Sequence, residues 1–66
     1  SKAFKNQDAT IKLSRATKEE LELLMKIKNT KFAYEMIEMM IDSYVVNELS
    51  NDEQRSFRTL KEFILS

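Results

Sequence analysis

Residues 8–14 read Asp8-Ala-Thr-Ile-Lys-Leu-Ser14, and this stretch decides the fold that the sequence predicts. Its apolar side chains (Ala9, Ile11, Leu13) alternate with polar ones (Thr10, Lys12, Ser14). Strict alternation predicts a β-strand with one apolar face. No other segment has this pattern, and a lone strand cannot satisfy its backbone hydrogen-bonding groups. We therefore expect the strand to pair with the same strand of a second copy.

A first helix is expected directly after this strand. Thr17-Lys-Glu-Glu20 has the pattern of a capping box, in which a hydroxyl and a carboxylate three residues later satisfy free amide groups at a helix start. The helix should run to about Lys28, because its apolar residues share one face up to that point. Asn29 tolerates the left-handed conformation that often ends a helix, and the chain has no Gly to take that place.

Two further helices complete the predicted order of arm, strand, helix, helix, helix. The second should run from Lys31 or Phe32 to Glu48, and its apolar residues cover more than one stripe, which favours burial on several sides. Ser50-Asn-Asp-Glu53 is another capping box and predicts a third helix over 51–65. In a short chain, the broad apolar surface of the second helix again indicates a partner subunit.

Composition supports a small assembly of identical chains. Sixty-six residues allow one domain, which buries only about 60% of its unfolded surface. The chain has no Cys and no His, so disulfides and the usual zinc ligands are excluded and oligomerisation is the remaining source of stability. We expect no metal or other cofactor and no membrane span, and we expect the protein to work in the bacterial cytoplasm.

Charge is separated along the chain although the net charge is zero. Residues 1–18 carry five bases and one acid, residues 19–31 are balanced, and residues 32–66 carry seven acids and three bases. A dimer that brings two basic ends together would present a strong positive field. Such a local field attracts a polyanion whatever the total charge.

The order of a strand and two short helices resembles the ribbon-helix-helix family of repressors. The likeness covers about residues 8–46, and Glu35-Met-Ile-Glu-Met-Met-Ile-Asp-Ser-Tyr44 is similar to that family's second helix. The turn Asn29-Thr-Lys-Phe-Ala33 and the third helix depart from the family pattern. The resemblance implies a mostly α-helical, intertwined dimer with one N-terminal strand per chain. Its parts would be a basic arm (1–7), the dimerising DNA-binding domain (8–48) and an extra C-terminal helix (49–66).

The family resemblance also implies a function, which is sequence-specific binding of double-stranded DNA by a ribbon in the major groove. The outward face of the ribbon would read bases through Thr10, Lys12 and Ser14, whose side chains can donate to or contact base edges. So short a reading surface implies cooperative assembly of several dimers on repeated sites. The protein would be a transcriptional repressor or a regulator of plasmid replication, partition or transfer.

Phosphate contacts are expected at the start of the second helix, where free amide groups and the helix dipole favour an anion. The residues predicted to bind phosphate, there and in the basic arm and strand end, are Lys5, Arg15, Asn29, Thr30 and Lys31. In the simpler interpretation, Thr10, Lys12 and Ser14 are only the solvated face of an edge strand, on which Lys12 deters aggregation. Lys28 and Lys31 would then only be solvated or complement a helix C-terminus.

Two other interpretations stay open. The first is an interaction adaptor, similar to an antitoxin or a partition protein, that binds another protein through the apolar stripe of the third helix, which consists of Phe57, Leu60, Phe63 and Ile64. The second is a structural alternative, a helix-turn-helix or three-helix bundle in which residues 8–14 are coil. An enzyme is not expected, because no set of nucleophile, base and metal ligands is present.

Overall fold

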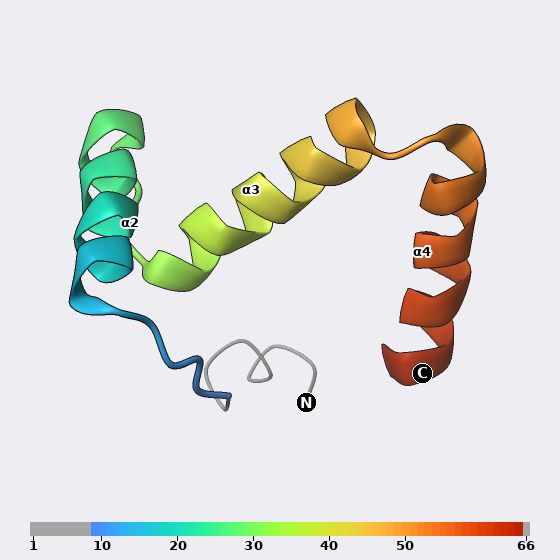
Figure 1. Cartoon of the computed structure of the whole chain (residues 1–66), viewed down its shortest axis with the longest axis horizontal. Coiled ribbons are helices and arrows are strands. Elements are labelled where there is room, and N and C mark those ends of the chain that lie inside the picture. The colour runs from blue at the N-terminus through green and yellow to red at the C-terminus, as the bar shows by residue number, and fades with distance from the viewer. Residues whose placement is uncertain (1–8, 66) are drawn as a thin grey trace.

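A computed structural model describes residues 9–65, which form three α-helices joined by short turns (Figure 1). Helix α2 spans Arg15–Lys28, α3 spans Ala33–Glu48 and α4 spans Asn51–Leu65. In Figure 1, α3 runs diagonally between the other two helices, with α2 beside its start and α4 descending from its end, so the three helices follow a zigzag path.

The predicted N-terminal strand is wrong for the residues that the structure describes. Residues 9–14 have no regular secondary structure, and no strand occurs anywhere between residues 9 and 65. The physical reason is that an extended segment becomes a strand only beside another strand. Every later described element is helical, and Ser14 at the end of the segment caps α2 instead. The ribbon-helix-helix fold is therefore not seen, and the coil alternative for this segment agrees with the structure. Asp8 and the arm at 1–7 lie outside the described residues.

The N-cap of helix α2 lies three residues before the predicted one. Ser14, not Thr17, is the N-cap: its backbone is extended (φ −68°, ψ 159°) and its hydroxyl oxygen accepts a hydrogen bond from the Thr17 amide at 3.1 Å. The Ser14 hydroxyl also donates to Thr17 Oγ1 at 3.0 Å. An extended serine that caps a helix has a backbone conformation similar to that of a strand residue, so the alternating pattern is compatible with either structure.

The predicted end of α2 is confirmed. Asn29 follows Lys28 in the left-handed conformation (φ 55°, ψ 46°), and it is the one non-glycine residue with positive φ between residues 9 and 65. The amide of Asn29 donates to the Lys26 carbonyl at 3.2 Å, and the amide of Thr30 donates to the Met25 carbonyl at 2.8 Å. These bonds satisfy carbonyls at the end of α2 and reverse the chain toward α3.

The two later helices agree closely with the sequence. Helix α3 starts one or two residues after its predicted start and ends at Glu48 as expected. The Ser50 capping box is confirmed: the Glu53 amide donates to Ser50 Oγ at 3.1 Å, and the Ser50 amide donates to Glu53 Oε1 at 2.8 Å. Helix α4 therefore starts at Asn51, as predicted.

The core of the described chain is very small. Only Leu21 of α2 and Met36 of α3 are buried, and α2 and α3 are the two helices that pack closely against each other. Helix α4 buries none of its side chains. The Cα radius of gyration is 13.7 Å, whereas a compact domain of this length would have about 10.8 Å. Residues 9–65 of one copy thus leave most of their large apolar side chains exposed.

Candidate functional site

The first candidate surface is the basic segment that leads into α2, formed by Lys12, Arg15 and Lys18. All three residues are exposed, and residues 9–18 contain no acid. The first turn of α2 also has no acidic side chain, whereas α3 and α4 carry Glu35 and Asp52 in theirs. The free amides of a helix start favour an anion. The start of α2 has no acidic side chain that could interact with its free amides, and three cationic side chains lie on it or just before it.

The three residues predicted to read bases lie in or next to this segment. Thr10 and Lys12 are exposed on the irregular segment, so they do not share the outward face of a ribbon. Ser14 is exposed too, but its hydroxyl is engaged in capping α2. Arg15 is the first residue of α2, which puts its predicted phosphate contact close to Lys12.

The other predicted phosphate ligands lie at the turn between α2 and α3. Asn29 ends α2, the Thr30 hydroxyl is 4.0 Å from Met36 Sδ, and the Lys31 ammonium lies 5.6 Å above the ring of Phe32. The Glu35 carboxylate already accepts a hydrogen bond from the Phe32 amide at 3.3 Å. The start of α3 therefore holds a negative charge of its own, and we consider it a weaker anion site than the start of α2. Lys5 lies outside the described residues.

Helix α3 is the acidic element of the molecule. It contains Glu35, Glu38, Asp42 and Glu48 and no Lys or Arg. A helix with this charge would be repelled by a phosphate backbone. A helix-turn-helix in which α3 entered the major groove is therefore not compatible with the charges that the helix carries.

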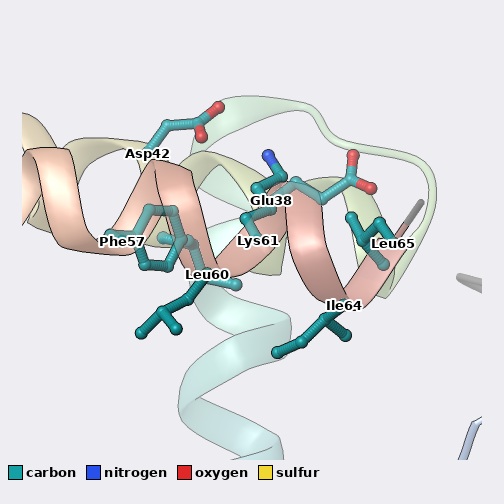
Figure 2. A pocket seen from close by; sticks show the side chains of 8 residues that line it. Glu38, Asp42, Phe57, Leu60, Lys61, Ile64 and Leu65 are labelled. Carbon is teal, nitrogen blue, oxygen red and sulfur yellow. The ribbon is translucent and has the colours of Figure 1, made fainter.

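The second candidate surface is an apolar cleft between α3 and α4 (Figure 2). The cleft has a volume of about 720 Å³. The residues that line it come from both helices and are Glu38, Ile41, Asp42, Phe57, Leu60, Lys61, Ile64 and Leu65. In Figure 2 the apolar side chains lie along one side of α4, and the charged groups of Glu38, Asp42 and Lys61 lie together on the other side of the view.

A second hollow of about 420 Å³ continues this apolar surface along α3. It shares Ile41 and Phe57 with the cleft, and its remaining lining residues are Ile37, Met40, Tyr44, Val45 and Leu49. The two hollows together form one surface, which we call the α3–α4 groove. The sequence predicted the apolar stripe of α4 and the broad apolar surface of α3. It did not predict that they would face a common groove, because this depends on the angle at the Leu49–Ser50 turn.

The rest of the described chain offers few other sites. Between residues 9 and 65 there is no cluster of acidic residues able to hold a metal ion, and no helix is long and apolar enough to cross a membrane. Comparison of the chain with protein-family models, with curated proteins and with solved structures found no match.

Proposed function

We propose that this chain is a homodimeric, sequence-specific binder of double-stranded DNA, and that the basic segment around the start of α2 is what holds the DNA. In this proposal it acts in the bacterial cytoplasm, as a transcriptional repressor or as a regulator of plasmid replication, partition or transfer. The β-ribbon has no part in it.

The observation that carries the proposal is the concentration of exposed positive charge on residues 9–18. This segment contains Lys12, Arg15 and Lys18 and no acidic residue. It includes the start of α2, whose free amides also attract anions. A DNA backbone presents regularly spaced negative charges, and contacts between it and lysine or arginine release bound counterions. Two copies in a dimer would double the number of such contacts.

The charge of the other helices supports the same orientation. Helix α3 carries four acids and no base, so it must lie away from the phosphates. Helix α4 is balanced, with three bases against three acids. The start of α2 and the segment before it carry only positive charge, so they can lie against DNA without electrostatic cost.

The test is the salt dependence of binding to a labelled, mixed-sequence DNA duplex, followed by fluorescence anisotropy. Replacing Lys12, Arg15 and Lys18 together by Ala should weaken binding and flatten the plot of log affinity against log salt. Six lost phosphate contacts in a dimer correspond to a change in slope of about 5. The matched control replaces Lys26, Arg55 and Arg58 by Ala, which removes equal charge elsewhere on the surface.

If the control flattened the slope as much as the basic-segment variant, the slope would depend only on the total charge of the protein. The assignment of the DNA contact to the basic segment would then be wrong. Sequence specificity is tested separately, by selection of bound duplexes from a random library. An enriched motif is expected for the wild-type protein, and a selection that enriches none would contradict the role of a specific regulator.

A second candidate function, an adaptor that binds another protein, is favoured by one observation, which is that α4 buries none of its side chains. Deleting residues 50–66 separates the two functions. An adaptor would keep its DNA binding after the deletion and lose a protein partner, whereas a chain that needs α4 for its own assembly would lose its dimer.

A further inference from the structure

The described helices are not held together by their own core. Between residues 9 and 65, fifteen large apolar side chains are exposed, and only Leu21 and Met36 are buried. Ordering a backbone costs free energy at every residue, and so small a core cannot supply it for three helices. The described helices therefore need a further surface that covers their apolar side chains.

The surface area of the chain leaves room for a standard interface. All 66 residues together expose 6129 Å² of polar and apolar surface, and a compact monomer of 7.8 kDa would expose about 4,400 Å². Each partner in a standard interface buries about 800 Å², and the exposed apolar side chains of the described helices are the part of this surface that an interface would cover. Phe63, Ile64 and Leu60, all on α4, are among the most exposed apolar residues, at 83%, 72% and 59%.

We propose that the α3–α4 groove receives helix α4 of a second copy of this chain, in a two-fold symmetric exchange that places each α4 against the partner's α3. The inference deepens the proposed function, because it gives the homodimer an interface. It does not depend on the DNA contact, which lies at the far end of α2.

A second copy fits the groove because groove and occupant are made of the same residues. An interface around a two-fold axis must be self-complementary. Phe57, Leu60 and Ile64 line the groove and also form the stripe of α4 that would enter it. The apolar stripe of α4 needs a partner to cover it. A second copy of the chain is present whenever the protein is made, so it can be that partner.

Charge complementarity supports the same arrangement. Helix α3 contains acids and no base, whereas α4 carries Lys61 at the groove. With α4 of one copy against α3 of the other, the Lys61 ammonium of one chain would lie near Glu38 and Asp42 of the other. In Figure 2 the charged ends of Glu38, Asp42 and Lys61 lie above the side chains of Phe57, Leu60 and Ile64.

The test compares two leucines that are equally exposed in the single chain. Leu60 in the groove and Leu23 on α2 are both 59% exposed and both lie within helices. By sedimentation equilibrium of the full chain, Leu60→Asp should raise the dimer dissociation constant by about 100-fold or more, because two charges enter a symmetric apolar interface. Leu23→Asp should change it by less than about tenfold. Equal effects of the two variants, or a wild-type chain that stays monomeric at all concentrations, would overturn the assignment.

Cysteine trapping keeps the proposal testable even if Leu60→Asp leaves the chain unfolded. The chain has no Cys, so single Cys variants react only at the chosen position. Mixing Ile41→Cys with an isotope-labelled Leu60→Cys should give an intersubunit disulfide on oxidation, identified by mass. Mixing Leu23→Cys with the same labelled Leu60→Cys chain should give much less. A similar yield from both mixtures would show that α4 does not lie in the partner's groove.

The outcomes also separate this inference from the proposed function. If the DNA test succeeds and the two leucines behave alike, the dimer is built elsewhere and only the groove assignment fails. If Leu60→Asp alone dissociates the dimer and the basic-segment variant keeps its salt slope, the groove assignment stands and the DNA contact fails. A monomeric chain with an open groove would point instead to a different protein as its occupant.

Discussion

Ser14 determines where the irregular segment stops and α2 starts. Its hydroxyl accepts the Thr17 amide, one of the groups that a helix start leaves without an intrahelical partner. Thr17 itself lies inside the first turn, and its hydroxyl only accepts a hydrogen bond from Ser14. The two residues have similar chemistry but unequal roles, which a pair of substitutions can separate.

We expect Ser14→Ala to lower the free energy of unfolding by about 1 kcal/mol, because the Thr17 amide loses its acceptor. Thr17→Ala keeps that amide and the Ser14 acceptor, so its cost should be at most a few tenths of a kcal/mol. Urea denaturation followed by circular dichroism measures both. A larger loss for Thr17→Ala than for Ser14→Ala would restore Thr17 as the cap and contradict the structure.

At the scale of elements, the turn between α3 and α4 sets the shape of the groove. Leu49 is extended (φ −90°, ψ 143°), and the Gln54 side chain reaches back from α4 to the end of α3. Its Nε2 donates to the Leu49 carbonyl at 3.1 Å and to the Val46 carbonyl at 3.5 Å. One amide thereby satisfies carbonyls that the end of α3 leaves free and ties the two helices together.

Replacing Gln54 by Glu should weaken this turn. A carboxylate cannot donate, and its charge is unfavourable beside the negative end of the α3 dipole, so we expect a loss of about 1–2 kcal/mol in the free energy of unfolding. Thr59→Glu adds the same charge to α4 on an exposed residue away from the turn and is the matched control. If both substitutions cost the same in thermal and urea unfolding, the Gln54 hydrogen bonds contribute nothing specific.

Elements with a local chemical signal were predictable from the sequence, and those that depend on distant partners were not. Asn29 predicts the end of a helix and the Ser50–Glu53 capping box predicts the start of one, each from its own residue types. The structure confirms both. The alternation in residues 9–14 carries no such signal, because an extended segment becomes a strand only if another strand lies beside it. The angle between α3 and α4 likewise depends on the Leu49 backbone and Gln54, so the groove could not be derived from the apolar stripes alone.

Across the whole of the described chain, residues 9–65, three helices in a zigzag share a core of two buried side chains and leave a large apolar surface exposed. The exposed pair Arg55–Asp52, at 3.3 Å, adds little to stability because both side chains are hydrated. If the groove is filled by a second copy, folding and dimer formation become one equilibrium.

The thermal midpoint of the wild-type chain should therefore rise with protein concentration. A tenfold increase contributes about 1.4 kcal/mol to the folded dimer, which corresponds to about 3–5 °C for a folded unit of two such chains. Differential scanning calorimetry at several concentrations measures the shift, and Leu60→Asp should remove it. A midpoint that does not move with concentration would mean that the folded species is a monomer.

The contrast between the positive segment 9–18 and the purely acidic α3 makes each subunit an electric dipole. In the field of a polyanion, a dipole experiences a torque as well as an attraction. If the protein binds DNA as proposed, it would be rotated before contact, so that the start of α2 arrives first and α3 points away. Because the field decays over about 10 Å at 0.1 M ionic strength, this pre-alignment would act only in the last stage of approach.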